Sequence, residues 1–275
     1  SENDTEHGFI SITVPRTPTE NDIYWNHANH GIYARGGDAF NYGVVKINGS
    51  SVVGILAKRN LTNYGYVIIN STYNTIGIQI DNDEKIDSDG NEILDTDTVI
   101  NNGTIIINTN NTTNYSTVSR GIAGPNNENN GTITINALND TVYGLVNSST
   151  NNGTINLNNT GTSKEINGIY SVNYGTNNGT IKIDGGNTAA VTGILYQNDI
   201  TKHWYKAYKS LAHNTKNSSI DITNARLAHG MEIDNRATGQ NDGSINIKDS
   251  AGDAIRGIFL YRQSQAINNG NISLE

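Results

Sequence analysis

The 275-residue sequence contains no cysteine, only three prolines and one methionine. The absence of cysteine excludes disulfide bonds, thiolate metal sites and a cysteine nucleophile. Charged residues make up 16% of the chain, whereas an ordinary globular domain has about 25%. No apolar run approaches the roughly 18 residues that a membrane-spanning helix requires. Because the net charge is -8 and the pI is about 5.2, we expect no nucleic-acid partner.

Three residue types dominate what remains. Asparagine, isoleucine and glycine together occupy 110 of the 275 positions. A disordered chain would have fewer branched apolar residues and a higher net charge, and collagen would have glycine at every third position. The bias therefore indicates an ordered chain built from repeats.

Two short phrases alternate along the sequence. The first, Asn-Asn-Gly-Thr-Ile-x-Ile, starts at residues 101, 129, 151 and 177, with weaker copies near residues 41, 63, 217, 241 and 268. The second is a glycine followed by Ile, Leu or Met, at Gly31, Gly54, Gly77, Gly121, Gly144, Gly168, Gly193, Gly230 and Gly257. Six of the eight intervals between these glycines are 23 to 27 residues long, and such a period predicts a solenoid.

Within each unit, alternating runs such as Thr132–Asn136 predict short strands with isoleucine inside and threonine or asparagine outside. We expect the Asn-Asn-Gly before each strand to supply the positive φ angles of a tight corner, and stacked asparagines to form amide ladders. The predicted fold is an all-β, right-handed parallel β-helix of about nine to ten coils of 22–27 residues, covering residues 31–275. Coils stacked about 4.8 Å apart would make a rod on the order of 45 Å long.

The two ends of the sequence differ from the repeats. Residues 1–30 hold two of the three prolines and one of the two tryptophans, and we interpret them as an N-terminal cap. The last residues, 271–275, lie inside an expected strand. We therefore expect the coils to continue beyond residue 275 in the native protein, and an uncovered terminal coil would allow copies to pack as a homo-oligomer.

The alternation of Asn-Asn-Gly-Thr-Ile with Gly-Ile-Tyr or Gly-Leu-Val over residues 31–275 resembles the passenger domains of bacterial autotransporters, the adhesins of type V secretion. The resemblance implies a right-handed β-helix that is secreted or held at the cell surface. It also implies attachment to the outer membrane through a region that this chain does not contain, and adhesion to host or bacterial surface proteins or glycans, as in virulence.

A first insertion, at residues 81–100, is strongly acidic. Residues 81–97 contain eight acidic side chains and one lysine. The pattern favours a solvated β-hairpin around the Asp89-Gly90 turn. A calcium loop with Asp87 and Asp89 as ligands is the alternative, but Lys85 stands where the first ligand of such a loop belongs. We therefore expect no metal or cofactor, with calcium as the alternative.

A second insertion, at residues 197–216, is basic and aromatic. Residues 201–216 contain four lysines and no acid, and Trp204, Tyr208 and Leu211 are spaced as on one face of a helix. Aromatic anchors among polar groups are typical of binding hot spots, although the same segment could simply cover a face of the coil. The candidate binding residues are His203, Trp204, Tyr205, Lys206, Tyr208 and Lys209.

Catalysis has less support than adhesion. The sequence contains neither a Gly-x-Ser-x-Gly elbow nor a His-Glu-x-x-His motif. A β-helical lyase or glycosidase would need acids on one coil face near a basic residue; Asp184 and Asp221 occupy similar positions, and the pattern places no basic partner beside them. We expect a non-enzymatic adhesin that binds a surface protein or glycan. A carbohydrate-active enzyme and a structural stalk or surface-layer segment are the alternatives, and a flat Asn/Thr array that matches ice or a glycan is a further functional reading of the repeat.

Overall fold

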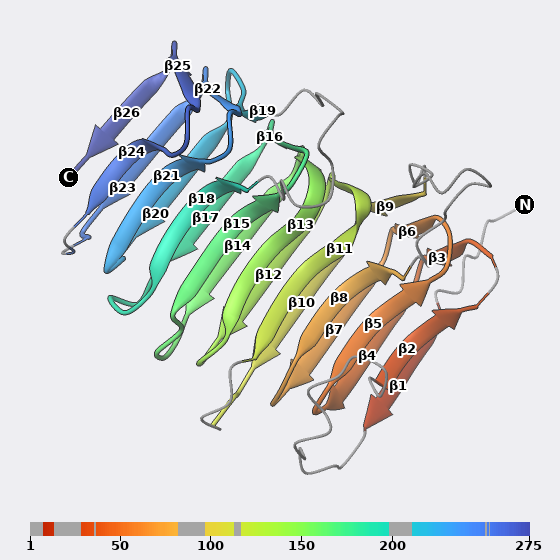
Figure 1. The fold of residues 1–275 in the computed structure, drawn as a ribbon. Coiled ribbons are helices and arrows are strands. Elements are labelled where there is room, and N and C mark those ends of the chain that lie inside the picture. Colours follow the sequence, from red (N-terminus) through yellow and green to blue (C-terminus); the bar gives the residue numbers. More distant parts are fainter. Residues whose placement is uncertain are drawn as a thin grey trace, which may run out of the picture.

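The computed structural model describes residues 8–13, 29–35, 37–81, 97–112, 117–197, 211–250, 252 and 254–275. Every regular element in these ranges is a β-strand. Each strand pairs in parallel with its counterpart in the next coil, so the strands lie side by side from β1 at one end to β26 at the other (Figure 1). The predicted all-β parallel β-helix is confirmed, whereas its right-handedness stays a prediction.

Each coil contributes strands to three faces. Face 1 is a ten-stranded sheet in which the strands follow chain order. Its members are β1 (Phe9–Thr13), β4 (Val44–Gly49), β7 (Tyr66–Ser71), β10 (Thr104–Thr109), β12 (Thr132–Ala137), β14 (Thr154–Asn159), β17 (Thr180–Asp184), β20 (Ser219–Thr223), β23 (Ser244–Lys248) and β26 (Asn271–Leu274). The pairing of β1 with β4 shows that residues 9–13, within the predicted cap, continue this sheet.

Face 2 carries the Gly-Ile phrase, and its strands also follow chain order. They are β2 (Asn29–Ala34), β5 (Val52–Ala57), β8 (Thr75–Ile80), β11 (Val118–Asn129), β13 (Thr141–Asn151), β15 (Glu165–Ser171), β18 (Ala190–Tyr196), β21 (Leu227–Ile233) and β24 (Ile255–Leu260). The sequence period is thus a structural period, because equivalent glycines occupy equivalent places in successive coils.

Face 3 consists of short strands that each end at an asparagine, which is the first residue of the Asn-Asn-Gly phrase or of a weaker copy in all but the strand that ends at Asn214. They are β3 (Ala39–Asn41), β6 (Leu61–Asn63), β9 (Thr98–Asn101), β16 (Tyr174–Asn177), β19 (Leu211–Asn214), β22 (Thr238–Asn241) and β25 (Gln265–Asn268). The long strands β11 and β13 turn from face 2 into face 3, where their last residues pair with β9 and β16. Residues 98–100 and 211–214, inside the two predicted insertions, are therefore parts of strands of the coil.

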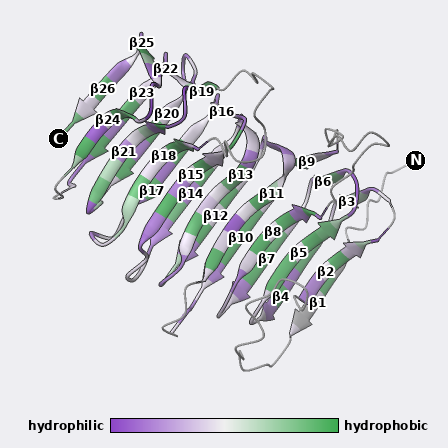
Figure 2. Cartoon of the chain, viewed as in Figure 1, coloured by the Kyte–Doolittle hydropathy of each residue, from purple (hydrophilic) through white to green (hydrophobic). Residues whose placement is uncertain are grey.

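Isoleucine fills the interior, as predicted. Along face 1, Ile105, Ile133, Ile155 and Ile181 stack in register, and none of these side chains is exposed. Buried and outward positions alternate strictly in β10, β12 and β14, so hydrophobic bands recur from coil to coil (Figure 2). Because full burial of an isoleucine contributes about 1.5–3 kcal/mol, every coil adds its own share of the core.

A buried ladder of asparagine side chains runs through the coils at the corner between face 3 and face 1. In each step, Nδ2 of one asparagine donates to Oδ1 of its counterpart in the next coil, at 2.7–2.9 Å. The members of this inner ladder are Asn41, Asn63, Asn101, Asn129, Asn151, Asn177, Asn214, Asn241 and Asn268. Because buried polar groups need partners, the ladder fixes the register of each coil on the next.

The glycine of each Asn-Asn-Gly has a different purpose from the one expected. Among the described glycines, only Gly186 has a positive φ, so the expectation that these corners need positive φ is wrong. A Cβ on Gly131 would lie 2.0 Å from the carbonyl oxygen of Gly103, and one on Gly153 would lie 2.0 Å from that of Gly131. Glycine is needed because the backbone of one corner rests directly on the next.

The inner ladder makes a testable prediction about stability. Asn129→Ala leaves the amide of Asn101 and the carbonyl oxygen of Asn151 without their partners in a buried place, so we expect a loss of about 1–3 kcal/mol in the free energy of unfolding, measured by urea denaturation. The matched control is Asn130→Ala at the exposed neighbouring position, where we expect a change within about 0.5 kcal/mol. Equal losses of unfolding free energy in the two variants would contradict a specific contribution of the buried ladder to stability.

Candidate binding surface

The corner that holds the inner ladder also presents one outward side chain per coil. This residue follows the ladder asparagine directly, and in every member except Thr215 a glycine comes next. The residues form what we call the corner column: Tyr42, Tyr64, Asn102, Asn130, Asn152, Asn178, Thr215, Asp242 and Asn269. With the outward residues two positions before and two positions after each member, the corner column forms a three-column corner band along the rod.

The middle of the corner column is an exposed ladder of amides. Asn130 donates from Nδ2 to Oδ1 of Asn102 at 2.9 Å, Asn152 to Asn130 at 2.8 Å, and Asn178 to Asn152 at 2.7 Å. On face 1, the next outward residues are threonines in register: Thr104, Thr132, Thr154 and Thr180. Outward asparagines and threonines therefore lie in register along this stretch, which we call the amide stretch; its flatness stays a prediction.

The N-terminal end of the corner column is aromatic. The rings of Tyr42 and Tyr64 are stacked, with centroids 4.9 Å apart and planes 2° apart. Their exposed fractions are 60% and 49%, and the flanking Phe40 and Tyr66 are 55% and 52% exposed. These four residues form the aromatic stretch, in which large apolar rings face solvent from two adjacent coils. Scattered apolar residues are common on surfaces, but clusters of them mark binding sites.

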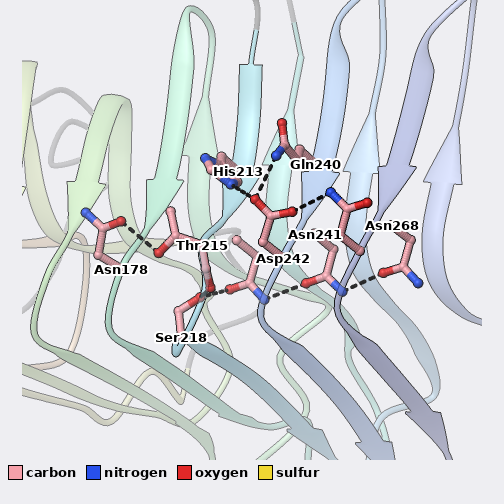
Figure 3. Close-up of polar contacts among 10 residues, drawn as sticks. Asn178, His213, Thr215, Ser218, Gln240, Asn241, Asp242 and Asn268 are labelled. Atoms are coloured by element: carbon pink, nitrogen blue, oxygen red, sulfur yellow. Dashed lines mark hydrogen bonds and ion pairs between the residues drawn. The ribbon is translucent and has the colours of Figure 1, made fainter.

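The C-terminal end of the corner column is a polar cluster around Asp242 (Figure 3). Its carboxylate accepts hydrogen bonds from Nδ2 of Asn269 at 2.8 Å and from Nε2 of Gln240 at 2.7 Å, and Nε2 of His213 lies 2.8 Å away. These contacts, first Asn269 and then His213, lower the pKa of Asp242 below its ordinary value. The cluster therefore holds a negative charge in the folded state.

One hydroxyl joins the amide stretch to this cluster. Thr215 donates from Oγ1 to Oδ1 of Asn178 at 2.9 Å (Figure 3). His213 and Gln240 lie in register on β19 and β22, so both approach Asp242 from face 3. The corner column thus changes from aromatic to neutral polar to acidic along one rod.

The Asp242 cluster predicts a specific dependence of stability on pH. Since the pKa of Asp242 is lowered on folding, its stabilisation is present at neutral pH and is lost as the pH falls below about 4. We expect the melting temperature of the wild type to exceed that of Asp242→Asn at pH 7, and the difference to shrink towards pH 3. A difference that stays the same from pH 7 to pH 3 would contradict the lowered pKa.

The binding and calcium sites predicted from the sequence fall outside the described residues. His203, Trp204, Tyr205, Lys206, Tyr208 and Lys209 are outside the described residues, as are the calcium candidates Asp87 and Asp89. In the sequence, the first group stands between β18 and β19, and β19 begins two residues before His213. The corner column was not singled out from the sequence, although Tyr42 and Tyr64 stand where other repeats have their second asparagine.

The acids considered for catalysis have neighbours that the sequence pattern did not place. Lys182 lies in register with Asp221 on the adjacent strand, so the expectation of no basic partner is wrong for Asp221. Asp221 accepts hydrogen bonds from Ser219 and Asn246, at 3.0 and 2.7 Å. Asp184 lies one outward position further along β17, opposite Thr223. The two acids therefore belong to different rows of face 1.

Comparisons with protein-family models, with curated proteins and with solved structures found no match. In the part of the chain that the structure describes, no helix has the length and apolar character needed to cross a membrane. Within the same residues, no group of three or more His, Asp or Glu side chains is arranged to hold a metal ion. The fold and the corner band are the features that bear on function.

Proposed function

We propose that this chain is the rod of a secreted or surface-attached bacterial adhesin, and that outward side chains on the rod bind proteins or glycans on host or bacterial surfaces. The observation that carries the proposal is the aromatic stretch, because rings that are about half exposed stand on a scaffold whose own core is already filled. The repeats of the sequence, which resemble autotransporter passenger domains, support the same role.

The scaffold suits a role at a distance from the cell. Ten strands on face 1, stacked about 4.8 Å apart, give a rod on the order of 45 Å long. In a solenoid each unit contacts only its neighbours, and here each contact includes backbone pairing on three faces and a buried amide. In such a rod each coil is held in place by its neighbours, so the outward side chains keep fixed positions along its length.

The exposed aromatic side chains supply the chemistry of adhesion. Tyrosine is enriched at the centres of interfaces because it buries a large ring and retains a hydroxyl for hydrogen bonding. Tyr42, Tyr64 and Tyr66 offer three such rings within two coils. The segment 201–209 carries the same residue types, so it remains the second proposed contact region.

Adhesion is tested by binding of the labelled chain to epithelial cell layers and to immobilised matrix proteins. Three forms are compared: the wild type, Tyr42→Ala/Tyr64→Ala, and a variant in which a Gly/Ser linker replaces residues 201–209. The linker variant keeps residues 211–214, because β19 contains the buried ladder residue Asn214. Equal far-ultraviolet circular dichroism and urea midpoints show that each variant retains the fold.

We expect saturable binding by the wild type and a loss of about tenfold or more in at least one variant, since hot-spot residues contribute about 2 kcal/mol or more. Absence of binding to every cell layer and matrix protein would overturn the adhesin and leave a stalk. Release of reducing sugar from cell-wall polysaccharides, abolished in Asp221→Asn, would instead establish the carbohydrate-active enzyme.

A further inference from the structure

We propose that the corner band, from the aromatic stretch through the amide stretch, binds an uncharged, β-linked polysaccharide whose chain lies along the rod. The ligand class is a chain of glucose-configured sugars, such as glucose or N-acetylglucosamine. This inference rests on the proposed function and assigns the chemistry of its receptor.

The aromatic stretch leaves ring faces open to a ligand. The rings of Tyr42 and Tyr64 are stacked, with centroids 4.9 Å apart in nearly parallel planes. Each ring can cover only one face of the other, and the two side chains are 60% and 49% exposed, so ring surface stays open to a ligand. The axial C–H groups of a glucose-configured ring form a flat apolar surface, and such a surface packs on an aromatic face.

The amide stretch offers hydrogen bonds beside these rings. A carboxamide has two N–H donors and two acceptor lone pairs. The ladder uses one Nδ2 hydrogen and one Oδ1 lone pair of Asn130, through its contacts with Asn102 and Asn152. One donor and one acceptor of Asn130 therefore remain for a ligand. The hydroxyl of Thr132, two residues further on, lies on the same outward side.

The spacing of these groups favours a linear ligand. Equivalent side chains recur at about 4.8 Å, the distance between neighbouring strands, which is comparable with the length of one pyranose unit in an extended chain. The corner band is three residues wide in each coil and continues from coil to coil, so it is long and narrow. A stable protein–protein interface buries about 800 Å² on each partner, and a narrow, periodic band suits a linear chain better.

The charge of the corner band favours a neutral ligand. From Phe40 to Thr180, the outward residues of the band include one charged side chain, Glu128, whose Oε1 accepts a hydrogen bond from Asn152 at 3.0 Å. The band has no lysine or arginine along this length. Sulfated and uronic-acid polysaccharides would meet no cation there, whereas hydroxyl and acetamide groups match the amides and threonines.

The inference is tested by isothermal titration calorimetry with cellohexaose and chitohexaose as neutral probes and a heparin-derived hexasaccharide as the anionic probe. The proteins are the full chain, Tyr42→Ala/Tyr64→Ala, and Tyr42→Phe/Tyr64→Phe, which keeps the rings. Tyr33→Ala is the matched control, because Tyr33 on face 2 is as exposed as Tyr64, at 49%. Urea denaturation of each variant confirms that the coils remain stacked.

We expect at least one neutral hexasaccharide to bind, and the double alanine variant to bind it about tenfold more weakly, since aromatic packing contributes about 1.4 kcal/mol. The double phenylalanine and Tyr33→Ala variants should bind within about twofold of the wild type. Preference for the heparin probe, absence of binding by both neutral probes, or an unchanged double alanine variant would overturn the inference. Adhesion to cells that persists in any of these cases would leave the proposed adhesin intact with a different receptor.

Discussion

A buried asparagine side chain, hydrogen-bonded to its counterpart one coil away, is the constraint on which the rest of this molecule depends. An amide in an apolar interior needs its donor and acceptor satisfied, and here the counterpart asparagine in the next coil does so together with nearby backbone carbonyls. The chain length between ladder partners varies from 22 residues, between Asn129 and Asn151, to 38, between Asn63 and Asn101. The coil therefore accepts extra chain between face 2 and face 3, as between β8 and β9 and between β18 and β19, while the ladder asparagine keeps its place.

This constraint also creates the outward columns. Because the ladder fixes the register, the residue that follows each inner asparagine always emerges at the same corner, whatever its chemistry. Tyrosines at this position in two successive coils stack on each other, and asparagines there form hydrogen bonds with each other. The binding surface that we propose is thus a by-product of the buried ladder, and its specificity resides in a position that contributes little to stability.

The sequence was sufficient for the fold because stacking makes the repeat period, the interior isoleucines and the amide ladders consequences of one another. It was insufficient where one residue type satisfies two different physical requirements. The sequence pattern predicts that the glycine of the phrase, such as Gly131, adopts a positive φ. Glycine is needed there instead because the corner backbone of the neighbouring coil lies against it. The register of the strands explains the second wrong prediction, that no basic residue lies beside Asp221. Lys182 and Asp221 are 39 positions apart in the sequence, and only the pairing of their strands brings them opposite each other.

The corner column escaped the sequence interpretation for a related reason. Its asparagines belong to the same phrase as the buried ladder, so the sequence pattern predicts the same role in the corner of the coil for both residues of Asn129-Asn130. In the structure, Asn129 is buried and Asn130 is exposed. The informative positions are those where the buried asparagine of the phrase is retained and the outward asparagine is replaced, as at Asn41-Tyr42 and Asn63-Tyr64. In a stacked coil, a substitution that preserves the inner residue while changing the outer one alters the surface without disturbing the register. Such positions are where a repeat of this kind can acquire a ligand.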